Sequence, residues 1–388
     1  MKRVAIISDG NLQSEPRVLM EINALKYSYH LLLFGKESKL PYPFYNLKYL
    51  ESPARINFHF KYPLPIRKLI SAVLRAYLKI RSYKAVLSIT NLKKWNEAQL
   101  MKAQPNIIIL HGIMHLPWVC NAVSKLNVPL ILNFHEYYPL EFEDNEHWVK
   151  TIKPLYDDIL KKYSSKASSF FVVCNSIIKS YENIGITNQI LIRNSKPYYE
   201  LKPTQNSEDN IRMIHHGICN ASRRIDLTIE CMKHLPKNFF LDLMLIPDSI
   251  VYPKLRELAK NDPRINFLAP VPTNDIPVFI NAYDLGIFLL PPLNFNYLNA
   301  LPNKLFEFIQ ARLAIVVSPN PEMKDLVEKY QLGVVSKDYS AEEFAKAILL
   351  ASKNIDFYKR KSDEAARIIN DSEEQKKILR EVDRLCAV

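Results

Sequence analysis

The sequence contains few glycines and few cysteines, and each shortage argues against a class of protein. Only 7 of the 388 residues are glycine, against about 27 at average usage. Neither a GxGxxG run nor a Walker loop is present, which argues against a conventional dinucleotide or P-loop site. The 5 cysteines form no CxxC pair and have no histidine spacing suited to zinc. We therefore predict neither a disulfide framework nor a bound metal.

Long hydrophobic runs are also missing. No stretch approaches the roughly 18 uninterrupted apolar residues that a membrane-spanning helix needs, and the opening MKRVAIISDGN reaches charge and glycine too early for a signal peptide. Apolar residues make up 48% and charged residues 24% of the chain, which is typical of folded globular proteins. At about 150 residues per domain, the length predicts two or three domains in a cytoplasmic protein.

Acidic residues are absent from one segment of the chain. Residues 52–96 contain ten basic side chains and no Asp or Glu, so of the formal net charge of +12 only +2 remains for all other residues. A nucleic-acid-binding protein would concentrate charge in this way. A protein on an anionic membrane leaflet would do so too, because each surface cation contributes roughly 1 kcal/mol there.

Residues 65–84 of this segment have the pattern of an amphipathic helix. Apolar residues recur at i, i+3, i+4 and i+7 from Ile66 to Leu78 and form one continuous face. A basic helix with such a face is typical of elements that lie on a membrane surface. The alternative is that the apolar face packs on the core of its own domain. The membrane interpretation predicts four membrane-facing cations: Arg67, Lys68, Arg75 and Lys79.

Short β-branched runs alternate with helical patterns along most of the chain. In the first half, strands are predicted at residues 2–8, 30–34, 85–89, 106–110, 130–134, 169–174 and 190–192. An irregular segment rich in Pro, Asn and Ser follows at 194–210, and further strands are predicted at 211–214, 240–246, 265–268, 285–290, 315–317 and 334–335. Helical patterns include residues 17–27, 154–162 and a long tail at 358–385. The alternation predicts two doubly wound, parallel-sheet α/β domains in tandem.

Polar residues and glycines gather just after several predicted strands. In open parallel sheets, ligands bind at the carboxyl ends of the strands, and this is where His111, His135 and the pair His215-His216 are expected. The glycines at 10, 35, 112 and 217 also follow predicted strands closely. Their placement predicts backbone positions that need a positive φ or the close approach of another group. With two such domains, the expected site is the cleft between them.

Several strings of the sequence resemble family 4 of the glycosyltransferases. They are PRV at 16–18, HEYYP at 135–139, IRN at 192–194, Gly217 with Arg223, LPNKLFEFIQA at 301–311 and IVVS at 315–318. They occur in the family's order and span nearly the whole chain. The resemblance implies the GT-B fold, in which two Rossmann-like domains face each other across a cleft. The first would hold mainly the acceptor and the second mainly the nucleotide-sugar donor.

The resemblance implies a donor site in the second domain. Pro302 would lie in the first turn of a helix whose N-terminus, with Asn303 and Lys304, holds a diphosphate. Arg223 would add bidentate hydrogen bonds to the same oxygens, and Glu307 resembles the family's ribose ligand. The alternative for Lys304 and Glu307 is an ordinary surface ion pair at i, i+3.

Two positions depart from the family's pattern in this region. Asn299 replaces the first of two glutamates that lie eight residues apart, so we expect an amide contact to the donor sugar in place of a charged one. Arg312 replaces a small residue after the helix and is expected to narrow or recharge the nearby surface. Gly217 completes the predicted donor-binding set.

The resemblance also implies a catalytic histidine in the first domain. His135 resembles the family histidine near the reacting sugar, and Glu136 would orient its loop or the acceptor nucleophile. The alternative for His135 is a purely structural role. Four further residues are expected near the phosphates or the acceptor: Gly10, Asn11, Arg17 and His111. The family's transfer retains the anomeric configuration, and cations there do the work of a divalent metal, so we expect no metal and no cofactor.

These observations lead to one predicted domain plan and one predicted function. The plan is a first domain at 1–195, a linker at 196–210, a second domain at 211–365 and a C-terminal helix at 366–388, for which packing on the first domain is one option. The function is transfer of a sugar from a nucleotide-diphosphate sugar to a glycan or lipid-linked acceptor in bacterial surface-glycan assembly, at the inner face of the plasma membrane. The alternatives are a nucleotide-sugar epimerase on the same scaffold and a non-catalytic nucleic-acid-binding protein.

Overall fold

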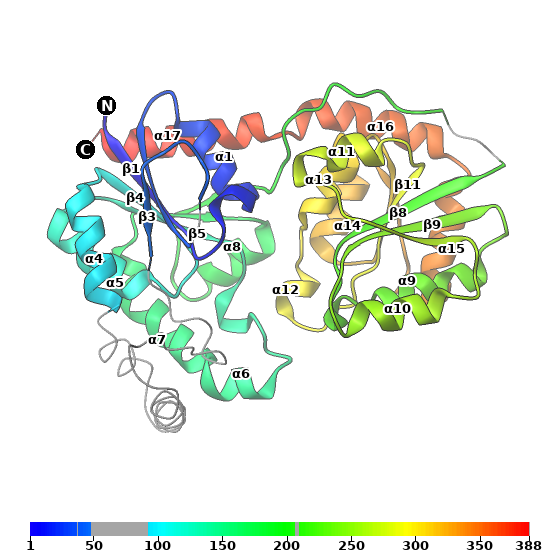
Figure 1. Cartoon of the computed structure of the whole chain (residues 1–388), viewed down its shortest axis with the longest axis horizontal. Coiled ribbons are helices and arrows are strands. Elements are labelled where there is room, and N and C mark those ends of the chain that lie inside the picture. The colour runs from blue at the N-terminus through cyan, green and yellow to red at the C-terminus, as the bar shows by residue number, and fades with distance from the viewer. Residues whose placement is uncertain (37, 48–91, 206–208, 388) are drawn as a thin grey trace. The chain divides into compact units, whose positions relative to one another are not determined.

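The computed structural model describes residues 1–36, 38–47, 92–205 and 209–387, which form two compact units (Figure 1). Unit 1 consists of Met1–Val172, Ser180–Leu191 and Gln375–Val388, and unit 2 of Val173–Lys179 and Ile192–Glu374. The predicted helix at 65–84, with its cations Arg67, Lys68, Arg75 and Lys79, lies outside the described residues. The predicted strand at 85–89 lies outside them as well.

The sheet of unit 1 is parallel throughout. Its strand order is β3-β2-β1-β4-β5-β6-β7. The chain therefore adds β2 and β3 on one side of β1 and β4 to β7 on the other side. The strands are β1 (Arg3–Ile7), β2 (His30–Gly35), β3 (Phe44–Asn46), β4 (Ile107–His111), β5 (Leu130–Phe134), β6 (Ser169–Val172) and β7 (Gln189–Leu191). Every residue of β4 and β5 is buried, as expected for central strands covered on both faces.

Helices connect these strands and cover the sheet (Figure 1). They are α1 (Pro16–Leu25), α4 (Leu92–Ala103), α5 (Leu116–Leu126), α6 (Glu146–Thr151) and α7 (Lys153–Tyr163). Helix α8 (Asn175–Glu182) is divided between the units, because its residues up to Lys179 belong to unit 2. Pro16 is the first residue of α1, where its fixed φ and missing N–H suit a helix start. The Asn145 side chain caps α6 by accepting a hydrogen bond from Trp148 N.

The last part of the chain belongs to unit 1. Within α17 (Asp371–Cys386), the Lys377 ammonium donates to the carbonyl of Leu191 at 3.1 Å. Near the end of the helix, Tyr29 Oη donates to Asp383 Oδ1 at 2.5 Å. Burial and this carboxylate raise the pKa of Tyr29, so its hydroxyl keeps its proton for the bond.

The sheet of unit 2 is also parallel, in the order β10-β9-β8-β11-β12-β13. Its strands are β8 (Ile211–Ile218), β9 (Phe239–Ile246), β10 (Ile265–Leu268), β11 (Leu285–Phe288), β12 (Ala314–Val317) and β13 (Gly333–Val335). Alternate residues of β9, from Phe239 to Leu245, belong to one buried apolar cluster. This period of two is that of a strand with one face on a core. Two parallel α/β units of this kind make the two-domain Rossmann-like GT-B fold.

Two groups of helices cover this second sheet (Figure 1). The helices are α9 (Ile225–Glu230), α10 (Val251–Ala259), α11 (Ile276–Ile280), α12 (Phe295–Leu298), α13 (Asn303–Gln310), α14 (Pro321–Lys329), α15 (Ala341–Ser352) and α16 (Ile355–Ile368). Residues of α9, α10 and α15 share the apolar cluster with β9. Helix α13 packs beside α11 and α16. The Phe308 ring of α13 lies edge-on against His216, with ring centroids 5.3 Å apart.

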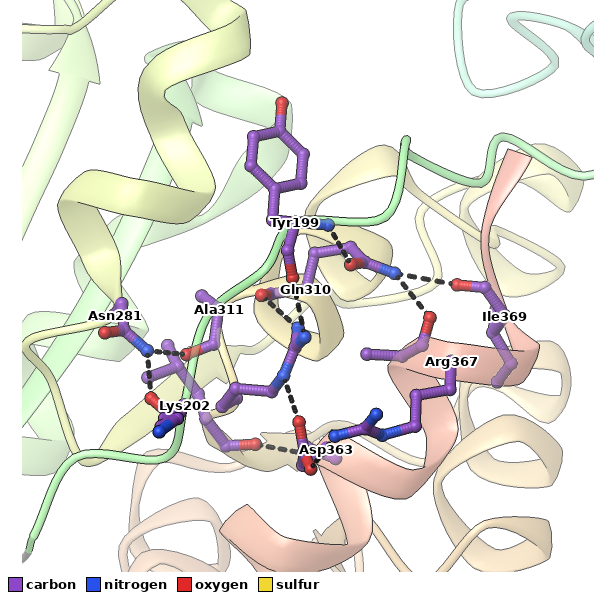
Figure 2. Close-up of polar contacts among 12 residues, drawn as sticks. Tyr199, Lys202, Asn281, Gln310, Ala311, Asp363, Arg367 and Ile369 are labelled. Carbon is purple, nitrogen blue, oxygen red and sulfur yellow. Dashed lines mark hydrogen bonds and ion pairs between the residues drawn. The ribbon is translucent and has the colours of Figure 1, made fainter. Parts of the chain in front are cut away.

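Residues 192–205 have no helix or strand and are held against unit 2 by polar side chains. Figure 2 shows Gln310 accepting a hydrogen bond from Tyr199 N and donating to the carbonyl of Ile369 at 3.0 Å. Asn281 donates to the carbonyls of Lys202 and Ala311 at 3.0 and 2.9 Å (Figure 2). These side chains supply the partners that a segment without secondary structure cannot find within itself.

Arg312 is part of the same set of contacts, which corrects the expectation that it alters the surface. It is fully buried and follows α13 with a φ of +62°. Its Nε donates to Asp363 Oδ1 at 2.7 Å and its Nη2 to the carbonyl of Tyr199 at 2.7 Å. The guanidinium therefore joins α16 to the irregular segment and adds no charge to the surface.

Several element boundaries differ from the sequence-based expectations. Strand β8 continues to Ile218, so His215, His216 and Gly217 lie within the strand and do not follow it. The predicted tail at 358–385 is two helices, α16 and α17, separated at Ile369 and Asn370. The short strand β3 was not predicted.

Candidate donor site and histidine network

The N-terminus of α13 is the centre of the predicted donor site. Pro302 is the N-cap, with extended backbone angles, and Asn303 is the first helical residue, so the expectation that Pro302 lies in the first turn was wrong by one position. Lys304 is 8% exposed and Glu307 3% exposed, because α13 is buried on nearly every side. The alternative interpretation, a surface ion pair between them, is not found among the described interactions.

Lys304 is a buried cation without a carboxylate or carbonyl partner in the described part of the chain. Its Nζ lies 3.7 Å from the centroid of the Phe288 ring. Burial and the nearby Arg223 guanidinium hold the Lys304 pKa well below its usual value. Gly217 has a φ of +129°, and a Cβ there would lie 3.5 Å from Lys304 Nζ. The backbone of β8 therefore passes close to the ammonium group.

Arg223 supplies the second cation. Among the described residues its Nε is buried without a hydrogen-bond partner, and its guanidinium lies 5.5 Å from the centroid of the Tyr297 ring. Tyr297 is fixed in turn by a hydrogen bond of 2.8 Å between its hydroxyl and that of Ser222. Two cations of one unit thus have hydrogen-bonding capacity that the described protein groups leave unused.

Glu307 is held by groups that the sequence did not associate with it. Lys196 Nζ lies 2.8 Å from Glu307 Oε1. His216 Nε2 lies 3.4 Å from Glu307 Oε2, without the geometry of a hydrogen bond. Burial lowers the pKa of His216 to about 4, although the carboxylate of Glu307 acts in the opposite direction. His216 is therefore neutral near pH 7.

The two asparagines of the predicted site differ in their partners. Asn299 ends α12, and its Nδ2 donates to the carbonyl of Phe295 at 2.9 Å. Asn303 Oδ1 is buried and has no hydrogen-bond partner among the described residues. Of the two side chains, Asn303 has a polar atom still to be satisfied by a ligand.

In unit 1 the predicted catalytic histidine directly follows β5. His135 Nε2 lies 3.0 Å from His111 Nδ1, and His111 Nε2 lies 2.8 Å from Glu21 Oε2. Burial lowers the pKa of His135 well below its usual value, and the charge of Arg17 adds to the effect. The backbone carbonyl of Glu136 accepts a hydrogen bond from Tyr181 Oη at 2.9 Å, which fixes this loop.

Arg17 joins the same network through a residue of β5. Arg17 Nε donates to Asn133 Oδ1 at 2.9 Å, and Asn133 Nδ2 donates to Glu21 Oε1 at 2.5 Å. Arg17, His111 and His135 were expected from the sequence, whereas Glu21 and Asn133 were not. The available signal was a polar residue in each of two otherwise apolar buried patterns, α1 and β5.

The other predicted loop residues, Gly10 and Asn11, lie after β1. The Asn11 side chain accepts a hydrogen bond from Gln13 N. A Cβ at Gly10 would lie 1.6 Å from Glu15 Oε1, so the Glu15 carboxyl group lies against this loop. Position 10 requires glycine because the Glu15 carboxyl group approaches so closely. Position 112 favours glycine because its φ is positive, at +79°.

The described residues contain neither a cluster suited to a metal ion nor a membrane-spanning helix. Nowhere in this part of the chain do three His, Cys, Asp or Glu side chains gather as a metal site requires. Among the described helices, none combines the length and the apolar character needed to cross a membrane.

The sequence of unit 2 matches a family model. Residues 212–354 match the model described as glycosyl transferases group 1. The matched residues all lie within unit 2. The matched residues include Gly217, Arg223, Lys304 and Glu307, which are the core of the predicted donor set. No curated protein matches the chain in sequence.

Solved structures resemble the whole chain. HepE of Anabaena, in complex with UDP, has a TM-score of 0.69 at 14% identity and covers 99% of this chain and 100% of its own. Sucrose-phosphate synthase of Thermosynechococcus elongatus has a TM-score of 0.70 at 12% identity, with both chains covered completely. The lipopolysaccharide outer core galactosyltransferase WaaB has a TM-score of 0.62 at 11% identity, with 97% of each chain covered. At these identities the likeness shows the fold.

Proposed function

We propose that this protein transfers a sugar, with retention of configuration, from a nucleotide-diphosphate sugar to a lipid-linked or polysaccharide acceptor. The observation that carries the proposal is the pair Lys304 and Arg223, two cations with unused hydrogen-bonding capacity in the glycosyltransferase domain. Lys304 belongs to the first turn of α13, and the positive end of the helix dipole favours an anion there.

A diphosphate would complete the groups that unit 2 leaves unsatisfied. Its oxygens accept hydrogen bonds from the Lys304 ammonium and the Arg223 guanidinium, and a buried setting strengthens both contacts. Its negative charge favours the charged form of Lys304, which burial alone disfavours. Glu307, held by Lys196, would accept hydrogen bonds from the ribose hydroxyls.

The proposed chemistry needs no separate base. The bond between the anomeric carbon and the diphosphate breaks as the acceptor hydroxyl attacks from the same face, and the departing phosphate oxygen takes the hydroxyl proton. Lys304 and Arg223 stabilise the negative charge that develops on the leaving group, which is the largest contribution we assign to the protein. His135 would hydrogen-bond a hydroxyl of the donor sugar. These cations take the place of a divalent metal.

The names of the fold relatives support the substrate class. HepE of Anabaena was solved with UDP and with UDP-glucose, and WaaB is a galactosyltransferase of the lipopolysaccharide outer core. UDP-sugars are therefore the first donors to test, and assembly of bacterial surface glycans is the setting that we propose. We also propose a peripheral location on the inner face of the plasma membrane, based on the basic segment 52–96.

The test is a donor screen with and without acceptor. Thermal shift and isothermal titration with nucleotide diphosphates and their sugars should show binding that Lys304→Ala and Glu307→Ala weaken about tenfold or more. Lys324→Ala removes an exposed lysine of the same unit and should bind like the wild type. Transfer to a lipid-linked glycan should continue in EDTA, and NMR of the product should show the donor's anomeric configuration. Unchanged shifts in Lys304→Ala would refute the site, and conversion of the donor without acceptor would favour an epimerase.

A further inference from the structure

Five side chains of unit 1 are joined in a row by hydrogen bonds. Arg17, at one end of the row, determines which atom donates and which accepts in the bonds that follow. A guanidinium only donates hydrogen bonds, so Arg17 Nε requires the oxygen of the Asn133 amide to face it, at 2.9 Å. The amide nitrogen of Asn133 then faces Glu21 and donates to Oε1 at 2.5 Å. Arg17, Asn133 and Glu21 are each at most 4% exposed, so water does not compete for these bonds.

The same direction continues through the two histidines. As a carboxylate, Glu21 has no proton to donate, so its Oε2 accepts from His111 Nε2 at 2.8 Å. A neutral imidazole with its proton on Nε2 has a lone pair on Nδ1. With His111 neutral, its Nδ1 accepts from His135 Nε2, which lies 3.0 Å away, whereas a protonated His111 would donate across the same distance. The neutral arrangement leaves His135 Nδ1 as the unprotonated nitrogen, and it makes no hydrogen bond to the described residues.

We propose that the His111 ring is neutral and that Glu21 and His111 are positioning residues that hold His135 in the tautomer protonated on Nε2, with the Nδ1 lone pair presented as a hydrogen-bond acceptor. The low pKa of His135 supports this, because a neutral ring is required. The consequence for catalysis rests on the proposed function: His135 accepts a hydrogen bond from a hydroxyl of the donor sugar and does not donate one. A relay that ends at a carboxylate is a general means of fixing an imidazole.

Histidine NMR tests the tautomer directly. The full-length protein labelled with ¹⁵N-histidine should give a long-range ¹H–¹⁵N spectrum in which His135, assigned with His135→Gln, is protonated on Nε2 only. In Glu21→Gln, Asn133 remains fixed by Arg17 and donates to the new amide oxygen, so the new amide nitrogen faces His111 Nε2 and donates to it. Both histidines should then move their proton to Nδ1. Glu97→Gln removes another buried carboxylate of unit 1, paired with Lys125, and should leave the spectrum unchanged.

Two results would overturn the proposal: a proton on His135 Nδ1 in the wild type, or a wild-type His135 tautomer in folded Glu21→Gln. Should Glu21→Gln fail to fold, the wild-type spectrum still decides the first point. The spectrum needs no substrate, so a protein that shows the expected tautomer but transfers no sugar contradicts only the proposed function. Once transfer is measured, Glu21→Gln should lower kcat about tenfold or more. KM for the donor should change less than kcat, because Lys304 and Arg223, the cations predicted to hold the diphosphate, are in unit 2.

Discussion

Lys196 and Glu307 form a buried ion pair in unit 2, with Lys196 Nζ 2.8 Å from Glu307 Oε1. Lys304 lies one helical turn before Glu307 on α13, where an i, i+3 pair would be the ordinary arrangement. Because Lys196 holds the carboxylate, Lys304 contacts the Phe288 ring and keeps its hydrogen-bonding capacity. A lysine from the irregular segment before β8 thus determines which cation of the site is available to an anionic ligand.

UDP binding should take up a proton at alkaline pH. The pKa of Lys304 is lowered in the empty site and rises when a diphosphate binds, so the affinity should fall as the pH rises through the lowered pKa. Titration calorimetry above about pH 7.5, where the diphosphate is fully ionised, in two buffers of different ionisation enthalpy, measures the uptake. Lys304→Met should bind UDP about 10- to 100-fold more weakly and take up no proton. Equal uptake by Lys304→Met and the wild type would contradict this.

His216 should make unit 2 less stable in acid. Its pKa in the folded state is about 4, against 6.5 for an unperturbed histidine. The folded state therefore binds fewer protons than the unfolded state between these values, and stability present above pH 6.5 is lost as the pH falls to 4. The whole loss is about 3 kcal/mol, of which about 2 kcal/mol falls between pH 7 and pH 5. Amide hydrogen exchange of β8 and β9 at pH 7 and pH 5 measures the change in stability of unit 2. Tryptophan fluorescence would not report on this unit, because all three tryptophans lie in unit 1.

The control for this acid effect is His216→Gln, which has no titrating ring. As the pH falls below 6.5, the opening free energy of unit 2 should decrease more in the wild type than in the variant. A difference that is constant between pH 7 and pH 5 would show that the neutral ring is not the cause.

Replacing Arg312 should destabilise unit 2, whereas replacing its neighbour Arg367 should not. Both arginines pair with Asp363, but Arg312 is fully buried and the Arg367 side chain is 63% exposed. Arg312→Ala leaves buried acceptors without a donor and should cost about 3 kcal/mol. Arg367→Ala should cost less than about 1 kcal/mol. Hydrogen exchange of α16 and of residues 197–205 checks both values, and equal effects would contradict the prediction.

Membrane binding should depend on the basic segment at 52–96. Anionic liposomes should carry the wild type in a flotation assay, and neutralising Arg67, Lys68, Arg75 and Lys79 together should reduce the bound fraction, because each surface cation contributes roughly 1 kcal/mol. Lys324→Ala, Lys329→Ala and Lys361→Ala combined are a control for loss of charge elsewhere. Equal flotation of the wild type and the neutralised variant would remove the support for a membrane location.

The apolar strands could be predicted from the sequence, and the polar ones could not. Residues 130–134 and 265–268 were predicted with the bounds of β5 and β10, because short apolar runs end there at clear breaks. The prediction ended β8 at Ile214, since two histidines follow. In the structure both are buried, because aromatic rings pack against them. The pattern of polar and apolar residues along the sequence does not reveal which aromatic rings pack against a histidine.

Some residues of the candidate sites could be predicted from the sequence and others could not. Lys304, Arg223, His111 and His135 were predicted from local strings and their positions after strands. Lys196, Glu21 and Asn133 were missed, because each acts through a residue far away in the sequence, as Asn133 does in bonding to Glu21. Single buried polar residues in apolar patterns are the only sign of such pairs, and that sign does not name the partner.

The division of the chain between the two units has a practical consequence for chimaeras. Gln375–Val388 belongs to unit 1, where Tyr29 bonds to Asp383, although it follows all of unit 2 in the sequence. A hybrid that exchanges unit 2 between two homologues therefore needs a second junction near residue 374 in addition to one near residue 192. With a single junction, the graft would carry a foreign terminal helix onto unit 1 of the host.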